Sequence, residues 1–246
     1  MPIQILQLES TTSDGVVLKS YVCLPESASH DNPAPAILVA PEWWGVVEHP
    51  QKVTERLAEA GFAAVAMDVY GEGKLTTDAA QANEWMSQML ADQDMLMARC
   101  KLIMDDFTDL EAVDKNRLGA IGFCFGGKIV LDMAREGFPL KAVATFHGNP
   151  DPKQPAQKGK FTAKVLVAHG EADSMVSMDA IEGLKKELDN ADVEYTVDVY
   201  EGAKHGFTNP NADKRAEENG VDLGYDADAA KASWDKMIAF MRDNLV

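Results

Sequence analysis

Residues 122–127 read Gly-Phe-Cys-Phe-Gly-Gly and directly follow the strand-like run Arg-Leu-Gly-Ala-Ile at residues 117–121. The spacing Gly-x-nucleophile-x-Gly is typical of a nucleophile elbow, a sharp strand-to-helix turn that holds one side chain in a strained backbone conformation. Cysteine stands here at the position that serine usually takes. Bulky side chains beside the turn would clash, which explains Gly122 and Gly126. The motif predicts that Cys124 is exposed at a helix N-terminus, where the helix dipole favours a thiolate.

The rest of the chain alternates short apolar runs with helix-like segments. The expected strands are Ile3–Leu8, Val16–Leu24, Ala36–Ala40, Phe62–Met67, Leu118–Gly122, Ala142–Phe146, Ala163–Ala168 and Tyr195–Tyr200. The expected helices are Pro50–Ala60, a segment from Cys124 to Gly137, a segment with Ile181, Leu184 and Leu188, and a segment from Trp234 to Leu245. The stretch Thr76–Phe107 has no strand signal and is expected to form two helices or one broken helix.

This alternation predicts an α/β fold. Short, fully apolar strands between helices are typical of a mostly parallel central sheet that helices cover on both faces. The first two strands flank Ser13-Asp-Gly15 and are expected to form a hairpin. The 246 residues are 46% hydrophobic and 26% charged and contain no linker-like stretch, so we expect a single domain over residues 1–246.

The chain is strongly acidic, with a formal net charge of −17 from 23 basic and 40 acidic residues. Such a surface repels nucleic acids and anionic lipids, so neither is an expected partner. No apolar run is long enough to cross a membrane, and the first ten residues lack the features of a signal peptide. We therefore expect a cytoplasmic protein, either a monomer or a small homo-oligomer, that acts on a small molecule.

The three cysteines, Cys23, Cys100 and Cys124, show no Cys-x-x-Cys spacing, which argues against a disulfide framework or a zinc site. Cys23 lies in a strand-like run and Cys100 in a helical pattern, so both are expected to be buried and inert. The sequence contains no Walker A loop, no dinucleotide-binding glycine motif and no cluster of metal ligands. We therefore expect neither a cofactor nor a metal.

A cysteine nucleophile needs a base and a carboxylate that orients the base. His205 lies in a glycine-punctuated loop after the last expected strand, and loops at the carboxyl ends of parallel strands are where ligands bind. After the penultimate expected strand, either Glu171 or Asp173 could supply the carboxylate. Asp173 is preferred because the preceding glycine turns the chain past the strand end. The order Cys124, Asp173, His205 is the nucleophile–acid–base order of α/β-hydrolases.

An acyl-transfer site also needs two backbone donors for the oxyanion. The Phe125 N–H, directly after the nucleophile, and the Trp43 N–H, in the loop after the third expected strand, are the expected pair. Glu42 lies beside Trp43, and a carboxylate near the thiol disfavours a free thiolate unless His205 supplies the opposite charge. One of Trp43 and Trp44 is expected to pack in the core or at its rim.

Six motifs are distinctive when they occur together: Pro41-Glu-Trp-Trp-Gly45, Met67-Asp-Val-Tyr-Gly71, Gly122-Phe-Cys-Phe-Gly-Gly127, Phe146-His-Gly148, His169-Gly-Glu-Ala-Asp173 and His205-Gly-Phe-Thr-Asn-Pro210. With them, nearly the whole chain resembles the dienelactone hydrolase (carboxymethylenebutenolidase) family of α/β-hydrolases. The resemblance implies that Cys124, Asp173 and His205 form the triad. It also implies that Glu42 pairs with the resting thiol until substrate shifts this carboxylate, and that His205 then stabilises the thiolate.

One departure from the family pattern concerns the substrate. The resemblance implies that members specific for dienelactone bind its carboxylate with arginines, one of them four residues after the catalytic histidine, where this chain has Asn209. Lys74 is the only cation between Tyr70 and Ala98, and Arg99 follows. Dienelactone itself is therefore not the expected substrate. The candidate residues of the substrate pocket are Trp44, Tyr70, His147, Phe207 and Asn209.

Two functions of different classes fit these residues. The first is a hydrolase of carboxylic esters or lactones that uses a Cys-His-Asp triad and an acyl-enzyme intermediate. The alternative is a catalytically weak ligand-binding or sensing protein that retains the hydrolase shell, which the missing arginine and the restraint by Glu42 favour. A redox-sensing Cys124 is a weaker third reading, because no resolving cysteine is evident.

Overall fold

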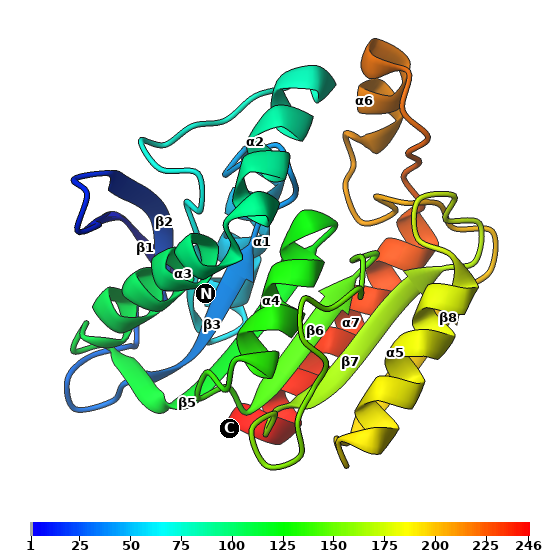
Figure 1. Cartoon of the computed structure of the whole chain (residues 1–246). Coiled ribbons are helices and arrows are strands. Elements are labelled where there is room, and N and C mark those ends of the chain that lie inside the picture. Colours follow the sequence, from blue (N-terminus) through cyan, green and yellow to red (C-terminus); the bar gives the residue numbers. More distant parts are fainter. Residues whose placement is uncertain (1) are drawn as a thin grey trace. The chain divides into compact units, whose positions relative to one another are not determined.

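The computed structural model describes residues 2–246, and Figure 1 shows its helices and strands. The strands are β1 (Ile3–Thr11), β2 (Val17–Pro25), β3 (Ala34–Ala40), β4 (Ala63–Ala66), β5 (Val113–Phe123), β6 (Ala142–Phe146), β7 (Lys164–Gly170) and β8 (Tyr195–Tyr200). The helices are α1 (Glu48–Glu59), α2 (Ala79–Ala91), α3 (Gln93–Thr108), α4 (Phe125–Arg135), α5 (Met178–Asn190), α6 (Ala212–Asn219) and α7 (Ala227–Leu245).

The strands form a mixed, mostly parallel sheet, whose hydrogen-bonded order is β1-β2-β4-β3-β5-β6-β7-β8. β1 and β2 form the predicted antiparallel hairpin. β2 is also antiparallel to β4, whereas β3 and β4, β6 and β7, and β7 and β8 are parallel pairs. The predicted α/β fold with a mostly parallel sheet is therefore confirmed.

The described chain forms two compact units, and the first holds the residues up to 119 together with residues 245–246. Every residue of β3 is buried, as expected of a parallel strand with helices nearby. Helix α1 packs on β2, β3 and β4, and helix α3 packs on β1 and β2. Helix α1 turns one apolar face inward and buries Val53 and Leu57 at helical spacing, which explains why this amphipathic segment docks here.

The second unit holds residues 120–244, which include the last part of β5 and the strands β6 to β8. Every residue of β6 is buried, and so is every residue of β7 except Lys164. Helix α4 packs on β6, and Figure 1 shows α4 and α7 on opposite sides of β6 and β7. Helices therefore cover both faces of this part of the sheet, as the continuous apolar strands predict.

Two helical features refine the prediction. The stretch Thr76–Phe107 forms two helices, because Asp92 interrupts the pattern and its Oδ1 accepts a hydrogen bond from the Met95 N–H at 3.0 Å, which caps α3. Helix α6 was not predicted, since its eight residues bury only Ala212 and carry no apolar stripe. It ends at Gly220, which has the left-handed φ of 65°.

None of the helices within residues 2–246 combines the length and the apolar character that crossing a bilayer requires.

Candidate active site

Cys124 lies between β5 and α4 with a φ of 54° and a ψ of −115°. Residues other than glycine rarely adopt a positive φ, and holding one there costs about 1–3 kcal/mol. The Cys124 N–H donates a hydrogen bond to the Phe146 carbonyl at 3.0 Å, and the Cys124 carbonyl accepts one from the Gly127 N–H at 3.0 Å. Backbone contacts on both sides therefore hold the strained turn, which leaves the Cys124 side chain partly exposed.

Glycines allow this turn to close. A Cβ atom on Gly122 would lie 2.0 Å from the Gly126 carbonyl oxygen, far inside any normal contact distance. A Cβ atom on Gly127 would lie 2.5 Å from Thr145 Oγ1 and 2.7 Å from the Gly148 Cα. The first turn of α4 thus packs backbone against backbone on the chain that follows β6, which only glycine permits.

The other two cysteines are buried, as predicted. Burial, together with the nearby charge of Glu55, raises the pKa of the Cys23 thiol to about 11, so this cysteine is a thiol at neutral pH. Cys100 lies in α3 and is fully enclosed. Among the three cysteines, Cys124 alone combines partial exposure with a helix N-terminus.

His205 and Asp173 form a buried pair, with His205 Nδ1 at 2.9 Å from Asp173 Oδ2. The other oxygen of Asp173, Oδ1, accepts hydrogen bonds from the N–H groups of Met175 at 2.8 Å and Val176 at 2.9 Å. Burial alone would raise the pKa of Asp173, but the hydrogen bond and charge of His205 and the two backbone hydrogen bonds outweigh it and lower the pKa below 3.8. Asp173 is therefore ionised at neutral pH and orients the imidazole through Nδ1–H.

Cys124 interacts electrostatically with the same imidazole. Burial lowers the pKa of His205, but the negative charge of Cys124 and the hydrogen bonds with Asp173 and Cys124 raise it well above its ordinary value of 6.5. Nε2, the ring nitrogen that Asp173 does not use, is buried and has no oxygen or nitrogen partner within residues 2–246. This arrangement can carry a proton from the thiol to Nε2 and stabilise the resulting thiolate–imidazolium pair.

His147 and Phe207, both predicted as pocket residues, lie around the histidine base. The His147 ring packs edge-on against the His205 ring, with the centroids 4.9 Å apart. Its backbone has a φ of 41°, and its Nε2 lies 3.0 Å from Thr208 Oγ1. The fully buried Phe207 ring packs on His147 with a centroid distance of 5.5 Å. These contacts limit the freedom of the His205 ring. No sequence pattern predicted that Thr208 contacts His147.

Phe125 and Asn209 lie in the same unit as the three triad candidates. Phe125 is the first residue of α4, so its N–H stands at the helix N-terminus directly after Cys124. Asn209 is buried, and its Oδ1 accepts a hydrogen bond from the Asn211 N–H at 2.9 Å. Asn209 occupies the position at which dienelactone-specific members are expected to carry a carboxylate-binding arginine. Its side chain instead stabilises its own loop.

The remaining predicted site residues, Glu42, Trp43, Trp44 and Tyr70, lie in the first unit. Glu42 is buried, with its Oε2 at 3.5 Å from His49 Nδ1. Trp44 is buried in the core, whereas Trp43 is partly exposed and accepts a hydrogen bond at its carbonyl from the Tyr70 hydroxyl at 2.9 Å. One of the two tryptophans therefore packs in the core, as expected. The roles of Glu42 and Trp43 at the cysteine stay predictions.

The sequence model of the dienelactone hydrolase family matches residues 18–245. The chain belongs to the dienelactone hydrolase family. A Yersinia pestis protein, provisionally named a carboxymethylenebutenolidase, is 29% identical over 238 residues that cover 92% of this chain and 84% of the relative. An Aquifex aeolicus protein with the same provisional name is 26% identical over 245 residues that cover 97% of this chain and 99% of the relative.

Solved structures of similar proteins agree with this family. A dienelactone hydrolase-like promiscuous phosphotriesterase from metagenomic libraries superposes with a TM-score of 0.92 at 30% identity, and the match covers 100% of both chains. A Klebsiella pneumoniae protein provisionally named a dienelactone hydrolase has a TM-score of 0.78 at 25% identity and covers 98% of this chain and 99% of its own. The Pyrococcus horikoshii acylaminoacyl peptidase, at 13% identity, shares the fold alone, with a TM-score of 0.74 over 100% of this chain and 42% of its own. The predicted α/β-hydrolase fold is confirmed.

One further buried histidine accompanies the triad candidates of this dienelactone hydrolase family member. His169 is the penultimate residue of β7 and is 1% exposed. Burial lowers the pKa of His169, and the charge of Asp173 opposes this effect without overcoming it, so His169 is neutral at pH 7. Within residues 2–246, no three His, Cys, Asp or Glu side chains gather in a group that could hold a metal ion.

Proposed function

We propose that this member of the dienelactone hydrolase family hydrolyses a carboxylic ester or lactone through an acyl-enzyme on Cys124. The observation that supports this most directly is the series formed by the strained Cys124, the imidazole of His205, whose charged form Cys124 stabilises, and the Asp173 carboxylate 2.9 Å from that imidazole. A nucleophile, a base and an orienting acid in this order are the components of acyl transfer.

The proposed reaction has two halves. His205 Nε2 accepts the proton of the Cys124 thiol, and the sulfur attacks the carbonyl carbon to form a tetrahedral oxyanion. The C–O bond to the leaving oxygen then breaks, His205 returns the proton to that oxygen, and a thioester remains on Cys124. In the second half, His205 takes a proton from water, the hydroxide attacks the thioester carbon, and the C–S bond breaks to release the acid and the thiol. Asp173 stabilises the imidazolium in both halves.

We propose from the sequence pattern that the N–H groups of Phe125 and Trp43 bind the oxyanion and that Glu42 controls the resting thiol. Two such donors stabilise the charge that develops in the transition state, and losing one typically reduces the rate by about 100- to 1,000-fold. The position of Asn209, in place of an arginine, favours an ester without a carboxylate at that point. We also propose that the enzyme acts on a small molecule in the cytoplasm, as a monomer or small homo-oligomer that forms a single hydrolase domain.

The deciding experiment compares the wild-type protein with Cys124→Ala on p-nitrophenyl butyrate and on a panel of lactones. We expect the variant to lose turnover to the level of the uncatalysed reaction, because no nucleophile remains. Cys100→Ala is the matched control, since it removes a buried thiol in α3 and is expected to retain turnover. Full activity of Cys124→Ala would contradict the mechanism. Stoichiometric labelling of Cys124 without repeated turnover would instead favour the ligand-binding alternative.

A second activity is proposed on one comparison. The metagenomic relative with a TM-score of 0.92 is a promiscuous phosphotriesterase, so we propose that Cys124 also attacks phosphotriesters with an aryl leaving group. The test is release of p-nitrophenol from a dialkyl aryl phosphate by the wild-type protein and by Cys124→Ala. Equal release by both proteins would contradict this second activity and leave ester hydrolysis untouched.

A further inference from the structure

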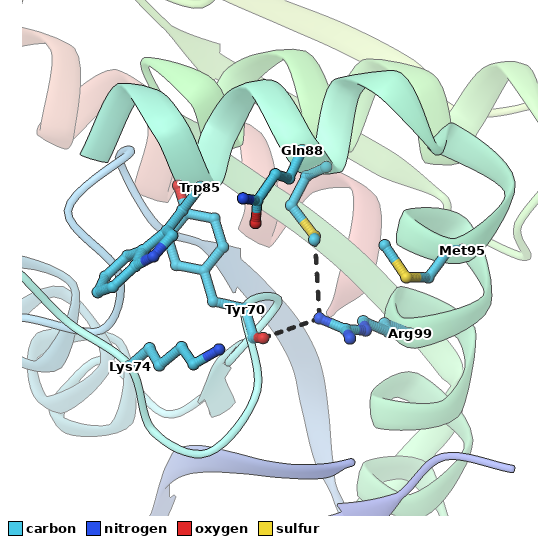
Figure 2. Close-up of a pocket in the computed structure, with 7 residues that line it drawn as sticks. Tyr70, Lys74, Trp85, Gln88, Met95 and Arg99 are labelled. Carbon is cyan, nitrogen blue, oxygen red and sulfur yellow. Dashed lines mark hydrogen bonds between the residues drawn. The ribbon is translucent and has the colours of Figure 1, made fainter. Parts of the chain in front are cut away.

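The first unit contains a pocket of about 240 Å³ between the loop after β4 and helices α2 and α3. Figure 2 shows Tyr70 and Lys74 on the loop side, Trp85 and Gln88 on α2, and Arg99 on α3. Its volume lies below the roughly 300–1,000 Å³ of sites for drug-sized ligands, so it suits a small molecule. All lining residues belong to one unit, and none of them takes part in the proposed triad.

Arg99 is the unusual member of this lining. It is 7% exposed, and its Nη1 donates hydrogen bonds to the carbonyl oxygens of Val69 and Tyr70 at 2.8 Å each. Nε is buried without a hydrogen-bond partner. Nη2 also makes no hydrogen bond to residues 2–246, and unlike Nε it is not fully enclosed by the protein. Because Nε is enclosed by the protein, Nη2 is the guanidinium nitrogen that is left to donate hydrogen bonds to a ligand.

A buried guanidinium normally has a carboxylate partner, because its charge is expensive to hold away from water. The chain contains 40 acidic residues, yet within residues 2–246 no carboxylate oxygen lies within 4.0 Å of an Arg99 nitrogen. The N–H groups of Nη2 can donate charge-assisted hydrogen bonds to a carboxylate. The side chain thus has the charge and the unused donor that a bound anion would complete.

The other walls indicate what the anion is attached to. The rings of Tyr70 and Trp85 lie 5.5 Å apart at 58°, and Met95 adds a flexible apolar side chain. Lys74 reaches toward the same space as Arg99 in Figure 2 and forms no ion pair within residues 2–246. Two cations beside aromatic and thioether walls fit a negative group on a flat apolar body.

We propose that this pocket binds a small organic carboxylate, with the carboxylate on Nη2 of Arg99 and its apolar body against the rings of Tyr70 and Trp85. Lys74 adds a second, more exposed positive charge. Binding at this site does not depend on the chemistry of Cys124, so evidence against the hydrolase mechanism would not contradict the proposed binding site.

The test is isothermal titration of the full-length protein with sodium benzoate in low-salt buffer, with neutral benzamide as the matched ligand. We expect saturable binding of benzoate, weak or no binding of benzamide, and weaker benzoate binding as ionic strength rises. Arg99→Met should weaken benzoate binding by at least about tenfold, and Lys74→Met by about two- to fivefold. Lys101→Met is the control on the same helix, because it removes an exposed charge paired with Asp105, and its affinity should equal that of wild type.

Arg99 also holds two backbone carbonyls, so circular dichroism must first show that Arg99→Met is folded. Gln88→Glu gives a second route that keeps Arg99, since it places a negative charge on the pocket wall and should weaken benzoate but not benzamide. Equal binding of benzoate and benzamide, no binding of benzoate, or unchanged affinity in Lys74→Met and Gln88→Glu would overturn the assignment.

Kinetics then distinguish the sources of the carboxylate. If the ligand is the substrate, Gln88→Glu raises KM for the monomethyl ester of a dicarboxylic acid and leaves KM for its dimethyl ester unchanged. If the ligand is a separate molecule, benzoate binds while both KM values stay unchanged in Gln88→Glu. Both KM patterns are compatible with the site, because in each case the titration shows that benzoate binds.

Discussion

Replacing Gly122 by alanine tests the geometry that exposes the cysteine. The new Cβ atom would lie 2.0 Å from the Gly126 carbonyl oxygen and 2.3 Å from the Gly126 carbonyl carbon. Ordinary contact begins at 3.4 Å, so the two backbones would have to separate by about 1.4 Å (3.4 − 2.0). The first turn of α4 has no room to move away, because Gly127 already touches the chain around Gly148. We expect a loss of about 3 kcal/mol or more in the free energy of unfolding.

The same displacement moves Cys124 relative to His205, and a shift of about 1 Å at a reacting group typically reduces the rate by about 100-fold. Urea denaturation and kcat/KM for p-nitrophenyl butyrate measure the two effects. Gly183→Ala in α5 is the control, because its Cβ would meet nothing within 4 Å and should stabilise the helix by about 0.5–1 kcal/mol. A Gly122→Ala protein with wild-type stability and activity would show that the close backbone approach at Gly122 does not hold Cys124 in place.

Three further changes have defined outcomes. Asp173→Asn should reduce kcat by at least about 100-fold. Because the pKa of Asp173 is lowered in the folded protein, its ionised carboxylate stabilises the fold above pH 3.8, and this stabilisation is lost as pH falls through the folded pKa. The urea midpoint of the variant should therefore lack this loss of stability at acid pH. Burial lowers the pKa of His205, and the charge of Cys124 is the largest contribution that raises it. The NMR titration of His205 should therefore move to lower pH in Cys124→Ala, and an unmoved titration would contradict the pairing of Cys124 with His205. Arg135→Met breaks the buried ion pair with Glu187 at 2.8 Å and should destabilise the protein by about 3 kcal/mol in thermal unfolding, whereas unchanged stability would show that the pair contributes nothing.

The elbow could be predicted from the sequence because its requirements are local. A positive φ at Cys124 and the close approach of Gly122 to the next turn both show as glycine spacing within six residues. The contact between His205 and Asp173 joins residues 32 positions apart, yet each follows a parallel strand of the same sheet. Loops at the carboxyl ends of such strands meet at one edge, so the strand positions predict that His205 meets a carboxylate after β7, and the turn at Gly170 favours Asp173 over Glu171.

The pocket around Arg99 could not be predicted in the same way. Arginine is normally assigned to the solvent face of a helix, and nothing in the pattern of α3 indicates that this one is buried. Its setting depends on how Trp85 on α2 and Tyr70 in the preceding loop pack together, which is tertiary information. Helix α6 could not be predicted because it is mostly exposed, and an exposed helix shows no apolar periodicity in its sequence.

Acyl transfer through Cys124 is tested most directly by mass spectrometry of the protein quenched in acid during turnover of p-nitrophenyl butyrate. The mechanism predicts a butyryl group on the peptide that contains Cys124, released by hydroxylamine as a thioester is, and no adduct on the peptides that contain Cys23 and Cys100. Cys124→Ala should show neither the adduct nor turnover. Turnover that continues in Cys124→Ala would contradict acyl transfer through this cysteine, and so would a stable acyl group on another residue.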